Sequence, residues 1–200
     1  MAVLGTPYPL FQQAYFVNDI EKSIKYWYDT FGAGPFSITE HHRCDEFTYR
    51  GTKQEADVSY AFGYLGDTMI QFIKQHDDTP SIYREMYESG REGYHHCAYL
   101  VTDFQAERQR LIDLGLEPAC ELFADGVNAS YFDTRHINGG FTEIHGDPPH
   151  ILQVFAQWRR AHDIHRPGDS PGRRLAVHQP RAFAGLRHDR RQFPTVQFTR

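Results

Sequence analysis

An internal repeat limits what this chain can fold into more than any other feature of its sequence. The segment that begins at Gln12 reads QQAYFVNDIEKSIKYWYDTFGAGP, and the segment that begins at His96 reads HCAYLVTDFQAERQRLIDLGLEP. Identical residues recur at a constant offset, which shortens by one residue near the end of the second copy. Two copies of one supersecondary unit explain these matches better than chance does. The matched pairs are Ala14 with Ala98, Tyr15 with Tyr99, Val17 with Val101, Asp19 with Asp103, Asp29 with Asp113, Gly32 with Gly115 and Pro35 with Pro118.

Each copy predicts the same order of elements. A short apolar strand (AYFV or CAYLV) comes first, and the Asp that follows it is placed to cap a helix. We expect the helices over about residues 20–31 and 104–114, each ending at a glycine. Three strand-like runs then follow: PFSITEHHR, DVSYAFGYL and DTMIQFIKQ in the first copy, and PACELFA, ASYFDTR and FTEIHG in the second. The sequence therefore predicts an α+β fold of two tandem βαβββ modules, residues 11–76 and 94–147, which form a curled mixed sheet around a cavity.

The paired modules account for residues 1–150, and the chain then changes in character. Residues 77–93 link the modules and contain a predicted helical turn, SIYREMYESG. Residues 151–165 predict a C-terminal helix, and residues 166–200 form an Arg- and Pro-rich tail that we expect to be loose. From Arg159 onward there are ten Arg, no Lys and three Asp, whereas the body is acidic. An acidic body argues against a nucleic-acid binder, so we interpret the tail as a solvated extension.

The cysteines and the start of the chain bear on the cellular compartment. No apolar run is long enough to span a membrane, and MAVLGTPYPLF lacks the basic-then-apolar layout of a signal peptide. Cys44, Cys97 and Cys120 are widely spaced without a CxxC pair, which argues against a disulfide framework and against a structural zinc site. We expect a cytoplasmic protein that forms a homodimer and has no membrane partner.

Four polar residues occupy equivalent places in the two copies. Gln12 and His96 lie on the predicted first strands, on the face opposite Tyr15 and its equivalent, because alternate side chains of a strand share a face. Gln71 and Glu143 interrupt the predicted last strands, MIQFI and FTEIH. If the modules pack with pseudo-twofold symmetry, all four converge. Two amides, one imidazole and one carboxylate suit one divalent ion with an open, oxygen-rich shell, and Zn, Ni, Co, Mn and Fe remain equally possible.

At these residues the chain resembles the vicinal oxygen chelate superfamily, which contains glyoxalase I, methylmalonyl-CoA epimerase, extradiol dioxygenases and bleomycin-resistance proteins. QQAYFVNDIEKSIKYWYDTFGAGPF, GYHHCAYLVTDF, MIQF and FTEIHG carry the resemblance, which covers roughly residues 11–147. The ligand positions of that superfamily fall at Gln12, Gln71, His96 and Glu143. Methylmalonyl-CoA epimerase has His at the first position, whereas glyoxalase I can carry Gln there. Gln12 argues against an extradiol dioxygenase, because it breaks the site of two His and one carboxylate that binds iron.

The resemblance also implies that Glu143 carries the chemistry. In the superfamily, the equivalent carboxylate can leave the metal and move a proton next to the substrate carbonyl. Epimerisation needs a second proton carrier, for which His145 and Glu55 are the candidates, although a structural role is also open for both. His95 should point to the opposite face from His96 and serve in packing or in support of the site.

Other polar residues on the predicted strands are candidates for substrate binding. Of His41 and His42, one should face the cavity and contact the substrate, and the other should be solvated. Tyr60, like Tyr64 and Tyr131, alternates with apolar residues and fits a pocket wall or the core. Arg135 either pairs locally with Asp133 or binds a substrate anion.

The sequence thus predicts a metal-dependent isomerase, epimerase or lyase that acts through an enolate or enediolate on a small 2-oxo, acyl or thioester substrate. The alternative is a non-catalytic binding or resistance protein of the same fold, which sequesters a small molecule between the modules. The four metal-capable residues discriminate between the two, because sequestration has no need for them.

Overall fold

Aspartate caps begin the two repeat-related helices of the computed structural model, which describes residues 8–175. Helix α1 (Ile20–Phe31) begins where the Asp19 side chain accepts a hydrogen bond from the Lys22 N–H, and it ends at Gly32 in a left-handed conformation. Helix α3 (Phe104–Asp113) begins in the same way, with the Asp103 side chain accepting from the Ala106 N–H. Both helices lie where the repeat predicts them.

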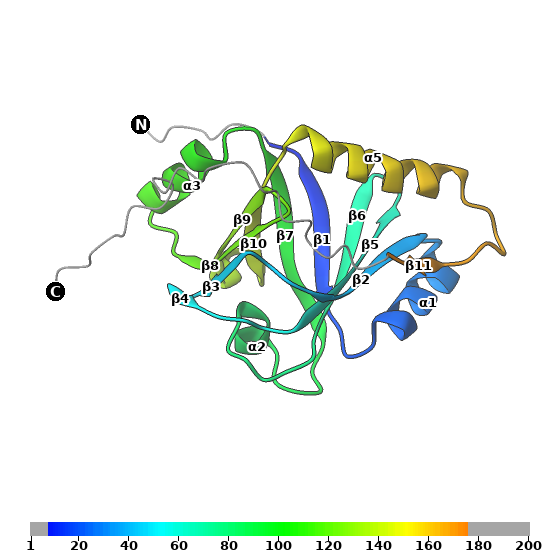
Figure 1. The fold of residues 1–200 in the computed structure, drawn as a ribbon, viewed down its shortest axis with the longest axis horizontal. Coiled ribbons are helices and arrows are strands. Elements are labelled where there is room, and N and C mark those ends of the chain that lie inside the picture. The colour runs from blue at the N-terminus through cyan, green and yellow to red at the C-terminus, as the bar shows by residue number, and fades with distance from the viewer. Residues whose placement is uncertain (1–7, 176–200) are drawn as a thin grey trace, which may run out of the picture.

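The strands form one sheet in which the strand order of the two copies is symmetric about the centre (Figure 1). The order is β11-β2-β5-β6-β1-β7-β10-β9-β8-β3-β4. The two first strands, β1 and β7, pair antiparallel at the centre, and each pairs parallel with the last strand of its own copy, β6 or β10. The predicted α+β fold with a curled mixed sheet is confirmed. The strand bounds are β1 Leu10–Phe16, β2 Phe36–His42, β3 Glu46–Tyr49, β4 Thr52–Lys53, β5 Val58–Leu65, β6 Thr68–Gln75, β7 Gly93–Val101, β8 Pro118–Ala124, β9 Val127–Phe132, β10 Phe141–Gly146 and β11 Gly172–Arg174.

A short connection forces the sheet to curl. Strand β2 ends at His42 on one side of the sheet, and β3 begins at Glu46 beyond the other side, where it pairs with β8. A trans peptide chain advances by at most about 3.6 Å per residue, so these two points are within roughly 15 Å of each other. The two sides of the sheet therefore approach each other, as the course of β2 and β3 in Figure 1 shows. The hairpin of β3 and β4 is a departure from the predicted βαβββ order.

Helices α1 and α3 pack on the outer face of the sheet, and two further helices pack on the inner face. Ile24 of α1 packs in a core cluster with Phe36 and Phe72, and α3 lies against β10. On the inner face, α2 (Ile82–Met86) adds Ile82 and Tyr83 to an aromatic core. Helix α5 (Pro149–Ile164) lies across the other end of the curl from α2 (Figure 1). The inner face is thus closed by a helix at each end.

Two short segments are more ordered than the sequence predicts. Strand β11 pairs parallel with β2, the Phe36 N–H donates to the Pro171 carbonyl at 2.9 Å, and the Leu175 N–H donates to Ile38 at 2.8 Å. The prediction that the chain is loose beyond Arg166 is therefore wrong for residues 172–175. These residues pair with the edge of β2, whose backbone groups can accept and donate hydrogen bonds there. Residues 176–200 lie outside the described part. A short helix, α4 (Arg135–Asn138), was also not predicted. Within residues 8–175, no helix combines the length and the apolar character needed to cross a bilayer.

Candidate active site

The four polar residues lie on the four central strands of the sheet. In sheet order they are Gln71 on β6, Gln12 on β1, His96 on β7 and Glu143 on β10, and they are between 0 % and 5 % exposed. Ala14 pairs with both Gln71 and His96, and Ala98 pairs with both Gln12 and Glu143. These two alanines are a matched pair of the repeat and are fully buried. Because a methyl group occupies little space, the four longer side chains can meet above the alanines.

Hydrogen-bond distances connect the four side chains in a continuous chain. The Gln12 amide donates from Nε2 to Gln71 Oε1 at 2.8 Å and lies 3.3 Å from His96 Nε2. The same His96 nitrogen is 3.0 Å from Glu143 Oε2. The convergence that strand alternation and pseudo-twofold symmetry predict is therefore present in the structure.

A β-bulge turns His95 toward His96. The register of β1 and β7 shifts between the pairs Ala14–His96 and Tyr15–Tyr94, which leaves His95 as the extra residue. The prediction that His95 points to the opposite face is wrong for this reason. Its ring is fully buried, with Nδ1 2.8 Å from His96 Nδ1 and Nε2 3.2 Å from the Ile82 carbonyl oxygen.

These contacts determine which nitrogen of His96 is free. A carbonyl oxygen can only accept, so His95 carries its proton on Nε2. Burial lowers the pKa of His95 well below its usual value, so the ring is neutral and its Nδ1 has a lone pair. That lone pair accepts from His96 Nδ1–H. His96 is therefore left with Nε2 facing Gln12 and Glu143 as its lone-pair nitrogen.

Glu143 faces this nitrogen as an ionised carboxylate. Burial raises the pKa of Glu143, but His96, when a proton on Nε2 makes it a cationic donor to Glu143, lowers it by more, together with His145 and Tyr131, so the pKa lies below the usual value. An anionic oxygen and a lone-pair nitrogen 3.0 Å apart in a buried site need a cation between them or a proton on one of them. Donor atoms around an ion with bonds of about 2.1 Å lie about 3 Å apart. The donor set therefore fits a divalent metal ion, with Gln12 turning its amide oxygen inward.

The structure separates the two predicted proton carriers. His145 lies on the same face as Glu143, with its ring against Phe11 and Phe155 and Nδ1 2.7 Å from the Gly146 carbonyl oxygen. Glu55 is exposed in the loop between β4 and β5. Among the described residues, no hydrogen bond or ion pair joins Glu55 to the four polar side chains. The geometry brings His145 to the site and leaves Glu55 outside it.

The predicted substrate-binding residues also differ in where they lie. His42 faces inward and packs edge-on against Tyr60, whereas His41 turns to the outer face, where it pairs with Asp57. Tyr60 is buried, and its hydroxyl is 3.2 Å from that of Tyr83, which fits the core rather than an open wall.

Arg135 lies in an ion-pair network rather than facing the four residues. Its guanidinium contacts Asp133 Oδ2 at 2.6 Å and Glu85 Oε1 at 2.5 Å, and Arg50 binds the same two carboxylates. This network joins α2 to the loops that follow β3 and β9. It corresponds to the local ion pair with Asp133, and binding of a substrate anion by Arg135 stays a prediction.

Sequence reasoning named His95 as a packing or supporting residue and Tyr131 as a core or pocket-wall residue, but it missed the contact that each makes with His96. His95 fixes the tautomer of His96, and Tyr131 packs edge-on against His96 with ring centroids 5.1 Å apart. The HisHis doublet at the start of the second copy was the available signal for the first. For Tyr131, the signal was the strand alternation that places it on the same face as Glu143, which is its direct partner on the neighbouring strand.

Comparison with known proteins agrees with this architecture. Residues 11–132 match the model of the Glyoxalase/Bleomycin resistance protein/Dioxygenase superfamily. Many solved structures are similar in fold, and two of them serve as examples. A hypothetical protein from Bacillus halodurans is 15% identical with a TM-score of 0.52, over 72% of this chain and 96% of that one. A methylmalonyl-CoA epimerase from Mycobacterium tuberculosis is 16% identical with a TM-score of 0.51, over 76% and 97%. No curated protein matches the sequence significantly. Since the family model spans most of the paired modules, the chain belongs to the glyoxalase, bleomycin resistance protein and dioxygenase superfamily, also called the vicinal oxygen chelate superfamily.

Proposed function

We propose that this protein is a metal-dependent isomerase, epimerase or lyase that moves a proton next to the carbonyl of a small 2-oxo, acyl or thioester substrate. The observation that carries the proposal is the buried contact of His96 Nε2 with Glu143 Oε2 at 3.0 Å, beside the Gln12 and Gln71 amides. A tautomer held by His95 and an ionised carboxylate in a dry site are what a metal-binding site requires. Fold similarity to a methylmalonyl-CoA epimerase supports, at this low identity, only the architecture.

Each of the four side chains has a role in this proposal. Gln12, Gln71, His96 and Glu143 would hold the ion. The ion would act as a Lewis acid on a substrate carbonyl oxygen, which acidifies the adjacent C–H bond. A Glu143 carboxylate oxygen would take that proton, since its lowered pKa keeps it ionised at neutral pH. His145, on the same face, would return a proton on the other side of the substrate carbon or relay it to solvent.

The surroundings of the four residues keep water away from them. Phe11, Phe62, Phe155 and Trp158 form an aromatic cluster where α5 packs on the inner face, and His145 contacts it. A buried carboxylate is a stronger base toward carbon when bulk water is absent. A substrate would reach Glu143 when this packing opens, and α5 is the closing element because it carries two of the four rings.

The second candidate function is sequestration of a small molecule between the modules. It predicts binding of an aromatic ligand at the inner face without exchange of substrate protons. Elemental analysis of the purified protein, followed by solvent-deuterium incorporation into acyl thioesters and 2-oxo compounds, separates the two. A divalent ion that is lost in His96→Ala, together with incorporation, supports the enzyme. Absence of both, in a protein that binds aromatic probes, supports sequestration and contradicts the proposal.

Replacing His95 by Phe tests whether metal binding depends on the hydrogen bond by which His95 fixes the tautomer of His96. Phe keeps the ring packing against Tyr83 and Phe141 but removes the acceptor for His96 Nδ1–H. Loss of such a supporting hydrogen bond typically weakens metal binding by about 10- to 100-fold, and we expect that loss here. The measurements are the metal dissociation constant and the 15N shifts of the His96 ring, which report its tautomer.

Tyr83→Phe is the matched control, because it removes one buried polar group from the same core and leaves the hydrogen bond between His95 and His96 intact. It should keep metal affinity and the His96 shifts. Unchanged 15N shifts and affinity in His95→Phe would show that His95 only fills space.

A further inference from the structure

A second group of metal-capable side chains lies on the outer face, across the sheet from the four polar residues. Asp57 directly precedes β5 and His76 directly follows β6, and the His76 N–H donates to the Asp57 carbonyl at 2.8 Å. His41 comes from the adjacent strand β2, and its N–H donates to Ser59 Oγ at 3.0 Å. Three strands therefore bring two imidazoles and a carboxylate to one place.

The backbone of His41 is held in an unfavourable conformation that aims its ring at this place. Its φ of 49° is left-handed, and the register of β2 and β5 shifts between Thr39 and His42. This conformation is unfavourable for a residue with a side chain, because the Cβ comes close to the following carbonyl oxygen. The bulge sends His42 to the inner face and His41 to the outer one. Such strain at a chemically capable residue is a reason to look for a site there.

The three side chains already have the spacing of a ligand set. His41 Nδ1 is 2.8 Å and 3.0 Å from the two Asp57 oxygens, and the His41 and His76 rings stack with centroids 4.5 Å apart. One nitrogen of each histidine and one Asp57 oxygen all lie within 4.8 Å of one another. Donor atoms around a bound ion lie about 3 Å apart, so a small closure would bring all three onto one ion.

Supporting hydrogen bonds orient two of these groups. Ser59 Oγ is 2.7 Å from His76 Nε2, and the His76 tautomer that donates from Nε2 to Ser59 has a lone pair on Nδ1 for an ion. The Asp57 N–H donates to the Asp77 side chain, which is held in turn by Gln75 and Thr79. Contacts of this kind orient metal ligands in known sites.

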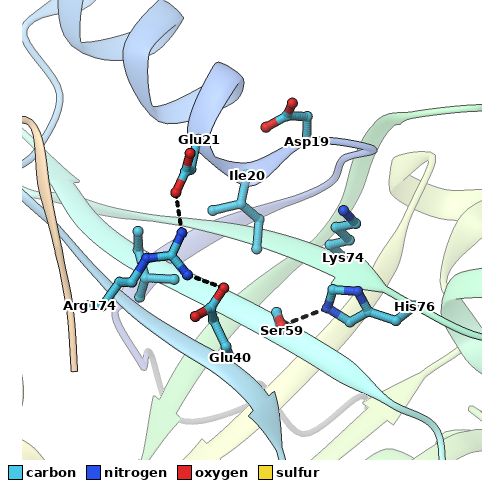
Figure 2. Close-up of a pocket in the computed structure, with 9 residues that line it drawn as sticks. Asp19, Ile20, Glu21, Glu40, Ser59, Lys74, His76 and Arg174 are labelled. Carbon is cyan, nitrogen blue, oxygen red and sulfur yellow. Dashed lines mark hydrogen bonds and ion pairs between the residues drawn. The ribbon is translucent and has the colours of Figure 1, made fainter. Parts of the chain in front are cut away.

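We propose that His41, Asp57 and His76 form a second metal site, which binds a transition-metal ion of the Zn²⁺ type through two imidazoles and one carboxylate. This ligand set leaves a coordination position open to solvent or to an exogenous ligand. A pocket of about 230 Å³ adjoins the site and includes Ser59 and His76 in its lining, with Lys74 beside them (Figure 2). On its other side, Arg174 pairs with Glu21 and Glu40. The Lys74 ammonium group could therefore pair with an anionic ligand of the ion within the same pocket.

Zinc stoichiometry tests this site separately from the inner one. Apoprotein is equilibrated with Zn²⁺ near neutral pH, and bound zinc per chain and its affinity are measured for wild type, His41→Gly and His76→Gln. Glycine suits the left-handed backbone at position 41, and glutamine can keep the hydrogen bond to Ser59, so both variants should fold. We expect each to lose one zinc equivalent, or to bind it at least about tenfold more weakly.

His136→Ala is the control, because His136 is an exposed imidazole on α4 away from the group. It should bind zinc as wild type does. If His41→Gly and His76→Gln bind as much zinc as wild type with equal affinity, or if His136→Ala loses as much as they do, the outer site is overturned. Loss of zinc from the two outer variants but not from His96→Ala would support the outer site and contradict the inner one, so the two proposals fail independently.

Discussion

Glu143→Gln is expected to lower the rate of substrate proton exchange by about a hundred- to ten-thousand-fold while most of the metal stays bound. An amide oxygen can still coordinate an ion, because ligation requires only a lone pair. Proton abstraction requires a carboxylate, and general acid–base catalysis contributes on the order of 10²–10⁴ in rate. The measurement is solvent-deuterium incorporation into a substrate that the wild-type protein turns over, with metal content determined on the same sample.

Glu107→Gln provides the matched control, since Glu107 is another buried glutamate, paired with Arg110 on α3 on the outer face. It should exchange substrate protons at the wild-type rate. If Glu143→Gln exchanged at that rate with its metal in place, Glu143 would be a ligand only. The base would then lie elsewhere, and His145 would be the next residue to replace because it shares the face of Glu143.

His96→Ala is expected to abolish most metal binding at the inner site. The substitution removes the only nitrogen donor among the four residues and leaves Glu143 as a buried carboxylate without its partner. Breaking a buried charge pair from one side typically costs about 3–5 kcal/mol, so the free energy of unfolding should also fall. Native mass spectrometry gives the metal content, and chemical denaturation gives the stability.

A second substitution keeps this prediction testable if His96→Ala does not fold. His96→Gln retains a polar group that can pair with Glu143, so it should fold while still lacking the nitrogen donor. His42→Ala is the control, because it removes an inward-facing imidazole that is not among the four. Metal content in His96→Gln equal to that of His42→Ala would contradict the assignment of the inner site.

The repeat alone was enough to predict the architecture and the meeting point of the four polar residues. Helix positions follow from caps and apolar spacing, which are local properties, and both repeat helices begin at their predicted aspartates. The convergence of Gln12, Gln71, His96 and Glu143 follows from two rules that need no coordinates: alternate residues share a face, and repeated units pack symmetrically. The matched alanines, Ala14 and Ala98, were visible in the same alignment, although their role as spacers was not.

Features that depend on irregular backbone or on distant partners could not be predicted in this way. A bulge changes the face of a side chain without any strong local signal, and it decided both the contact of His95 with His96 and the outward turn of His41. The pairing of β3 with β8, and of β11 with β2, joins segments that are far apart in the chain, and a short strand has little intrinsic preference of its own.

The sequence by itself therefore determined the two modules, their helices and the four residues that meet between them. Only the tertiary structure decided which neighbouring groups complete or leave that site: His95 and Tyr131 join it, whereas Glu55 and Arg135 lie elsewhere. The physical reason is the range of the interactions. Caps, periodicity and strand alternation act within a few residues and are written in the local sequence. Bulges, edge pairing and ion pairs depend on free-energy gains from partners that only the folded chain brings together.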